Sequence, residues 1–102
     1  MTVVWSERAE ASLHIVERYI LTNFGEKARS EFMQAAEETA NRLVQFPNTG
    51  KMEPLLAHRS KAYRSIVINR RSKLIYYVDE TRIVIADFWE CRREPSVLKQ
   101  GL

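Results

Sequence analysis

Basic residues gather in the second half of this 102-residue chain, and their spacing is the first indication of chemistry. No acidic residue stands between Glu53 and Asp79. That stretch holds six cations, namely Arg59, Lys61, Arg64, Arg70, Arg71 and Lys73. Such a patch attracts phosphate groups or an acidic partner. The alternative is a solvated loop and edge strand that happen to be basic.

Two of these cations and two later arginines lie on or beside neighbouring expected strands: Arg64, Lys73, Arg92 and Arg93. Side chains at such positions can converge on one concave surface of a sheet. A cluster of this kind suits a phosphodiester, because it stabilises the charge that grows on the non-bridging oxygens during transfer. The structural alternative is that Arg64 and Arg92 pair with Asp87 or Glu90 across the sheet.

Metal-free cleavage of RNA also needs a base for the 2′-hydroxyl and an acid for the leaving oxygen. The sequence offers few candidates, which are His58, Glu90, Tyr63, Tyr76 and Tyr77. A loop histidine is more typical of a solvated position, and the tyrosines are more typical of packing. Asp87 and Glu90 are three positions apart in an expected strand, so they point to opposite faces and form no carboxylate pair.

Composition excludes several kinds of site. The three glycines are too few and too scattered for a phosphate-binding loop, and one cysteine allows neither a disulfide framework nor a multi-cysteine zinc site. We therefore expect no metal and no cofactor. No apolar run is long enough to span a membrane, so we also expect no membrane partner. The single thiol fits the cytoplasm.

Hydrophobic spacing predicts two helices that form a hairpin. The first begins after Ser6 as N-cap and ends at Gly25, which suits a left-handed cap. The second runs from Glu26 or Lys27 to Pro47. The expected core stripes are Ala9, Leu13, Val16 and Ile20 in the first helix and Ala28, Phe32, Ala35, Thr39, Leu43 and Phe46 in the second.

Residues rich in Val, Ile and aromatic side chains predict strands at 63–68, 73–78 and 82–89, with a short one at 3–5. We expect residues 47–61 to form a long loop that Met52, Leu55 and Leu56 pin to the core. In the last strand, alternation places Val84, Ala86 and Phe88 on one face and Ile83, Ile85 and Trp89 on the other. The order β-α-α-β-β-β predicts a single α+β domain over residues 1–102, in two layers, with the helical hairpin on one face of a mostly antiparallel sheet and the other face partly open.

Two segments carry a resemblance to a known family: VVWSERAEASLHIVERYI at 3–20 and YRSIVINRRSKLIYYVDETRIVIADFWECRREP at 63–95. They resemble the RelE/ParE superfamily of bacterial type II toxins, and in particular its plasmid-stabilisation-like branch. The resemblance implies a cytoplasmic β-α-α-β-β-β toxin that an antitoxin protein neutralises in a hetero-oligomer. Some members enter the ribosome and cut mRNA, and others poison DNA gyrase.

The resemblance also assigns roles to the cations. It implies Arg64, Lys73 and Arg92 as catalytic, while Arg59, Lys61, Arg70, Arg71 and Arg93 are expected to bind RNA or another target. Ile66 replaces a second strand cation of the nucleases, and Leu98 stands where many of them have a tyrosine or histidine. We predict a toxin that inhibits translation by ribosome-dependent mRNA cleavage. The alternatives are a ParE-like gyrase inhibitor without nuclease activity and a degenerate, non-toxic module that binds an antitoxin.

Overall fold

The helical hairpin forms where the sequence predicts it. In the computed structural model, which describes residues 1–69 and 72–90, helix α1 (Glu7–Phe24) begins after Ser6, whose hydroxyl accepts a hydrogen bond from the Ala9 amide at 3.0 Å. Gly25 ends this helix with a φ of 93°, a region that favours glycine, and α2 (Glu26–Gln45) begins directly after it. Neither helix combines the length and hydropathy that a membrane span requires.

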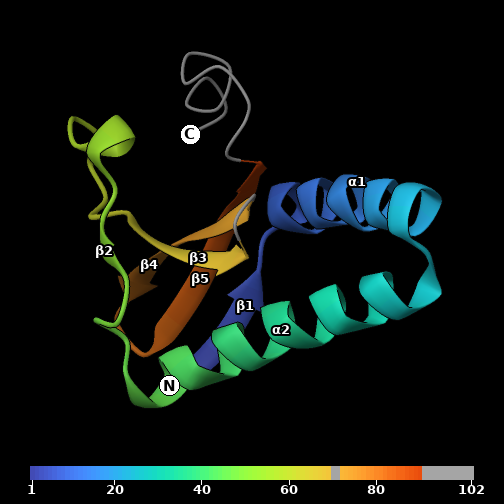
Figure 1. Cartoon of the computed structure of the whole chain (residues 1–102). Helices are drawn as coiled ribbons and strands as arrows, with labels where there is room; N and C mark the ends of the chain where they lie inside the picture. Colours follow the sequence, from blue (N-terminus) through green and yellow to red (C-terminus); the bar gives the residue numbers. More distant parts are fainter. Residues whose placement is uncertain (70–71, 91–102) are drawn as a thin grey trace.

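In the described part of the chain, five strands form one sheet beside the hairpin (Figure 1). They are β1 (Thr2–Trp5), β2 (Lys51–Met52), β3 (Arg64–Asn69), β4 (Ser72–Asp79) and β5 (Arg82–Glu90), in the spatial order β1-β5-β4-β3-β2. Strand β1 pairs with β5 in parallel, and the other pairs are antiparallel. The α+β class and the two-layer arrangement are therefore confirmed. The predicted loop at 47–61 is corrected in part, since it contains β2 and the short helix η1 (Pro54–Leu56).

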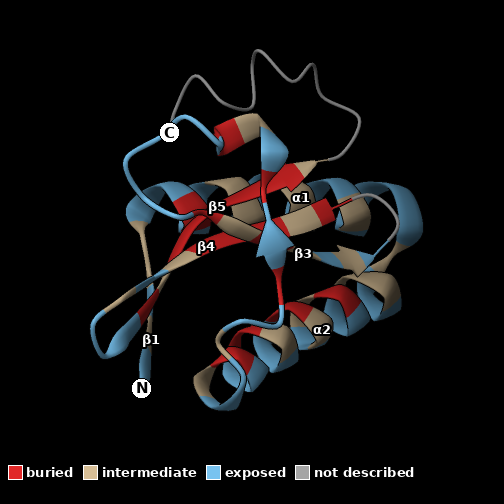
Figure 2. Cartoon of the chain, turned by 90° about the vertical axis from the view of Figure 1, so that its left-hand side faces the viewer, coloured by how far each residue is buried: buried red, intermediate tan, exposed pale blue. Residues whose placement is uncertain are grey.

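The main core lies between the hairpin and one face of the sheet, which we call the helix face. Buried positions gather in the central strands and along one side of α2 (Figure 2). This core joins Ala9, Phe32 and Leu43 from the helices with Leu74, Tyr76, Ile83, Ile85 and Phe88 from the strands. The prediction that Phe46 belongs to the core is wrong, because Phe46 follows the end of α2 and its side chain is 60% exposed.

The opposite face of the sheet, which we call the η1 face, is partly open as expected, since Val67 on this face is 59% exposed, but part of it is covered. The segment between α2 and β3 crosses it and places Leu55 and Leu56 against a second apolar cluster. That cluster is Leu56, Tyr63, Ile75, Ala86 and Trp89. Leu55 and Leu56 therefore pin this segment as predicted, whereas Met52 is 50% exposed and does not.

A β-bulge in β5 overturns the predicted division of its residues between faces. Ile75 pairs with Asp87 and the next residue, Tyr76, pairs with Ile85, so Ala86 has no partner in β4. One extra residue shifts the alternation. Phe88 consequently joins Ile83 and Ile85 on the helix face, while Ala86 packs on the η1 face with Trp89.

Candidate functional site

Lys73, a predicted catalytic cation, lies on the η1 face in an ion pair. Its ammonium contacts both carboxylate oxygens of Glu53, at 2.8 and 2.9 Å, and lies 5.4 Å from the centre of the Trp89 ring. The Ser65 hydroxyl donates a third hydrogen bond to the same carboxylate at 2.7 Å. Glu53 is 3% exposed and Ser65 is 8% exposed, so the pair is shielded from water on the carboxylate side. Its two opposite charges cancel within hydrogen-bonding distance.

Arg64 is hydrogen-bonded to the backbone of the segment that follows α2. Its guanidinium donates to the Gly50 carbonyl at 2.7 Å, and the Gly50 amide donates to the Tyr76 hydroxyl at 2.9 Å. That hydroxyl in turn donates to the Pro47 carbonyl at 2.8 Å. Burial raises the pKa of the Tyr76 phenol, although the Gly50 hydrogen bond and the Arg64 charge oppose the rise. The Tyr76 phenol is thus neutral at neutral pH, and its two hydrogen bonds join β4 to the segment that follows α2.

The expectation that Arg64 and Lys73 converge on one surface is wrong. Arg64 is two residues before Ile66, which packs on the helix face, and it pairs with Tyr76 of that same face. Lys73 is two residues before Ile75, which packs on the η1 face. Since side chains alternate along a strand, the two cations leave opposite faces of the sheet. A single phosphate group cannot contact both of them in this arrangement.

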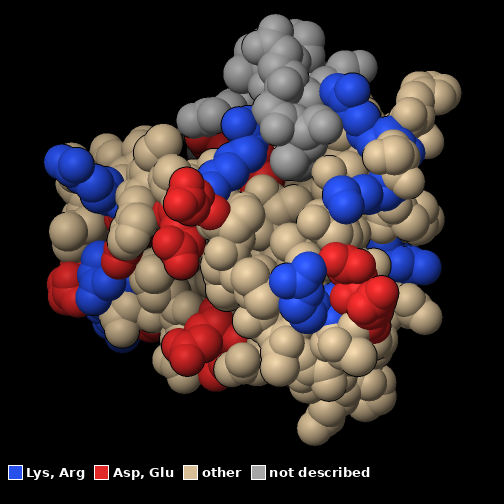
Figure 3. All heavy atoms as spheres, turned by 180° about the vertical axis from the view of Figure 1, so that it is seen from behind, with Lys and Arg blue, Asp and Glu red and all other residues tan. Residues whose placement is uncertain are grey.

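The predicted target-binding cations lie in several places. The Lys61 ammonium lies 4.5 Å from the centre of the Tyr77 ring on the η1 face, and Arg59 is exposed after η1. The predicted residues Arg70, Arg71, Arg92 and Arg93 lie outside the described residues. On the side of the molecule drawn in Figure 3, the described acidic and basic side chains are interspersed among uncharged ones.

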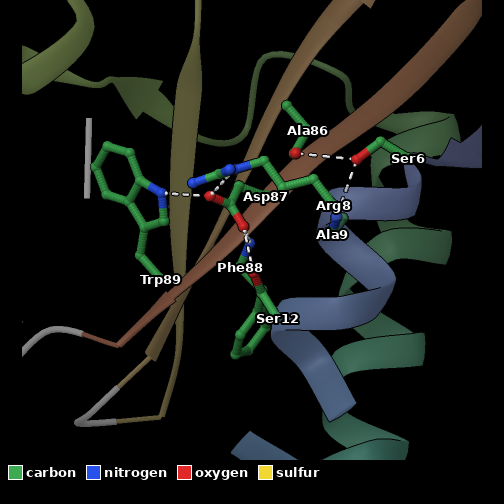
Figure 4. A network of polar contacts seen from close by, with 8 residues as sticks. All are labelled: Ser6, Arg8, Ala9, Ser12, Ala86, Asp87, Phe88 and Trp89. Atoms are coloured by element: carbon green, nitrogen blue, oxygen red, sulfur yellow. Dashed lines mark hydrogen bonds and ion pairs between the residues drawn. The ribbon is translucent and has the colours of Figure 1, made fainter. Parts of the chain in front are cut away.

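Asp87 is the most fully bonded acidic group in the described chain, and its partners are structural (Figure 4). One carboxylate oxygen accepts from Arg8 and from the Trp89 indole, both at 2.9 Å. The other accepts from Ser12 at 2.7 Å and from the Phe88 amide at 2.8 Å. These contacts lock α1 onto the bulged part of β5. The alternative in which Arg64 pairs with Asp87 is therefore wrong, and Arg92 lies outside the described residues.

Sequence reasoning missed Glu53 as a site residue. The sequence offered one signal for it: Glu53 is the last acidic residue before the basic stretch, and it directly precedes Pro54 in the expected loop. Pairing it with Lys73 needed the path of residues 53–63 across the η1 face, which no local pattern specifies. Among the described residues, no group of three or more potential ligands could hold a metal ion.

A family model described as "ParE toxin of type II toxin-antitoxin system, parDE" matches residues 3–95. Among solved structures, the chain resembles one from the chromosomal ParDE toxin–antitoxin system of P. aeruginosa, with a TM-score of 0.72 and 20% identity over 88% of this chain and 95% of that one. It also resembles the YoeB dimer of Staphylococcus aureus, with a TM-score of 0.57 and 22% identity over 85% and 92%. Comparison with curated protein sequences gave no significant match.

Proposed function

Since the chain belongs to the ParE toxin family of type II toxin–antitoxin systems, we propose that it arrests growth by binding a target protein rather than by cleaving RNA. One observation carries this choice: Arg64 and Lys73 leave opposite faces of the sheet, and Glu53 neutralises Lys73. Binding a protein needs only a complementary surface, whereas cleaving a phosphodiester needs cations and an acid–base pair around one phosphate.

We propose DNA gyrase as the target. The resemblance divides the superfamily into ribosome-dependent nucleases and gyrase poisons, and the nucleases depend on a converging group of cations. Ile66, which replaces one of these cations, packs against the helix-face core and carries no charge. The exposed residues Arg59 and Lys61 would then meet the target, together with Arg70, Arg71, Arg92 and Arg93. This action belongs in the cytoplasm, where gyrase and its DNA are found.

Cleavage of ribosome-bound mRNA is the second candidate, because Glu53 would serve as a base beside the Lys73 ammonium if RNA reached the pair. A carboxylate beside an ammonium group can accept a proton from a 2′-hydroxyl while the ammonium stabilises the phosphate. Glu53 is only 3% exposed, however, so the segment over the η1 face would have to open before RNA could reach it. That requirement places this candidate second.

Gyrase supercoiling and primer extension on mRNA separate the two candidates, once a growth assay has shown that the chain is toxic. Induction of the chain alone should arrest growth, and co-expression of the antitoxin should restore it. Purified chain should inhibit supercoiling by gyrase, and primer extension on mRNA after induction should reveal no new 5′ ends. Normal growth with folded protein in the cell would favour the degenerate module instead.

The decisive variant is the double substitution Glu53→Gln with Lys73→Met, which removes both charges together. A gyrase inhibitor should keep its toxicity within about threefold in this variant, since the neutralised pair contributes little to long-range attraction. A nuclease should lose about a hundredfold or more in cleavage rate. Arg82→Ala is the matched control, because it removes an exposed cation that pairs with Asp79. Loss of toxicity in the double variant, with normal thermal stability, would overturn the proposal.

A further inference from the structure

Strand β1, dark blue in Figure 1, is the last strand at one edge of the sheet, and its outer side is unpaired in the described structure. The Thr2 and Ser6 amides donate to carbonyls of the β5 side, each at 3.0 Å. Backbone groups point alternately to the two sides of a strand, so the amides and carbonyls of Val3 and Trp5 point away from β5. Within residues 1–69 and 72–90, no hydrogen bond engages these four outward groups. They form a short template for another strand.

The two edges of the sheet differ in how they are protected against pairing. Proteins guard an exposed edge with lysine, with proline or by keeping the edge strand very short. At the far edge, β2 has only two residues, one of which is Lys51, and Pro54 follows closely. Strand β1 is twice as long, with the sequence Thr-Val-Val-Trp, and holds neither a charged residue nor a proline. The β1 edge is therefore open to strand addition.

We propose that β1 pairs in antiparallel fashion with β1 of a second copy of this chain, about a twofold axis through Val4. In this register Val3 lies opposite Trp5 of the second copy, and the two residues exchange hydrogen bonds through the groups that point away from β5. The same exchange repeats on the other side of the axis, and Val4 lies opposite its own equivalent. Each outward donor thus meets an outward acceptor. The inference does not depend on the proposed function.

The side chains on both faces of β1 also suit pairing with an identical strand. Val3 and Trp5 lie on the helix face, where they border a groove of about 400 Å³ against α2. Trp5 of the second copy would lie at this groove beside Val3, and the exposed Glu37 of the groove offers an acceptor to its indole N–H. On the η1 face, Val4 adjoins Val84, and pairing would join the two copies in one apolar strip. Because β1 carries no charge, this self-pairing buries no ionised group of the strand.

Sedimentation of the full-length chain over a range of concentrations tests the dimer. A pair of four-residue strands is a small interface, so the wild type should pass from monomer to dimer as its concentration rises. Val4→Lys places two ammonium groups side by side at the twofold axis and should weaken the dimer about tenfold or more. Val78→Lys is the matched control, because Val78 is 38% exposed against 39% for Val4 but lies on β4, away from the edge, and it should weaken the dimer less than about twofold. A chain that stays monomeric at every concentration would overturn the inference, as would a dimer that both substitutions weaken equally.

Amide hydrogen exchange in the wild-type chain decides the same question if Val4→Lys does not fold. The Val3 and Trp5 amides should exchange rapidly in dilute solution and at least about tenfold more slowly at concentrations where the dimer forms. The Ser6 amide, which is bonded to the Ile85 carbonyl in each copy, should change far less. Rapid exchange at Val3 and Trp5 in the dimer would overturn the inference. Protection of these two amides by the antitoxin alone, in a chain that forms no dimer, would also overturn it and would assign the edge to the antitoxin.

Discussion

The Tyr76 hydroxyl accepts a hydrogen bond from the Gly50 amide at 2.9 Å, and this contact joins the middle of the sheet to the segment that follows α2. Gly50 fits there because it has no side chain. A Cβ at this position would lie 2.8 Å from both the Tyr76 ring and the Ser65 carbonyl. The contact fixes the point from which the chain crosses the η1 face, and so it sets where Glu53 meets Lys73.

Tyr76→Phe should lower the free energy of unfolding by about 1–2 kcal/mol, because two hydrogen bonds are lost and the Gly50 amide stays buried without its partner. Urea denaturation measures this change. Hydrogen exchange at the Gly50 amide should become faster, while exchange in α1 should change only with global stability. Unchanged exchange at Gly50 would mean that the hydroxyl does not hold the segment.

The raised pKa of Tyr76 predicts a loss of stability in alkali. The folded state favours the neutral phenol, so the contribution of this group is fully present below the ordinary pKa of 10.0. It is lost as the pH rises through the higher pKa of the folded state. The wild-type melting temperature should therefore fall more steeply above pH 10 than that of Tyr76→Phe. Parallel curves for the two proteins would contradict the prediction.

The Glu53–Lys73 pair predicts strong coupling in a double-mutant cycle. Lys73→Met should destabilise the chain by about 3 kcal/mol, since it leaves a buried carboxylate without its cation. Glu53→Gln should destabilise it less, because the ammonium of Lys73 keeps some access to water. The double variant should recover about 1–3 kcal/mol relative to the sum of the single changes. Additive single effects in thermal or urea unfolding would show that the two groups do not interact.

The sequence predicted the helices and most strands because their signals are local. Ser6, Gly25 and Pro47 each mark a helix end through hydrogen bonding or backbone restriction that depends on immediate neighbours. The two-residue strand β2 was missed, since Lys51 and Met52 form it only by pairing with Arg64 and Ser65. A strand that short has no periodicity of its own.

The site was less predictable, because its geometry depends on the register in which the strands pair. One unpaired residue, Ala86, moves Phe88 to the opposite face of the sheet, and nothing in the alternation of apolar residues marks that position. Arg64 and Lys73 were expected to converge because they are on neighbouring strands. Their faces follow from the pairing of Arg64 with Tyr76, which only the folded hairpin of β3 and β4 specifies.

Removing the buried Asp87 carboxylate should lower the free energy of unfolding much more than removing an exposed one. Asp87→Ala should lower the free energy of unfolding by about 3 kcal/mol, since it leaves the Trp89 indole and the Phe88 amide without their acceptor. Asp79→Ala is the matched control, because Asp79 also pairs with an arginine but on the exposed surface, and it should change stability by only about 0.5 kcal/mol. If the two substitutions lower the free energy of unfolding equally in chemical denaturation, Asp87 does not join α1 to β5 as proposed.

The ion pair between Glu17 and Arg29 predicts that the helical hairpin loses stability in acid. Its carboxylate accepts a hydrogen bond from Arg29 at 2.7 Å, which links α1 to α2, and it contacts His14 at 3.1 Å. The hydrogen bond from Arg29 lowers the pKa of Glu17 despite partial burial. The stabilising contribution is therefore present above the ordinary pKa of 4.5 and is lost as the pH falls through the lower pKa of the folded state. Thermal melts of wild type and Glu17→Gln should differ at pH 7 and approach each other below pH 4, while Glu38→Gln should follow the wild type throughout. A difference that persists unchanged into acid would show that the charge of Glu17 does not hold the two helices together.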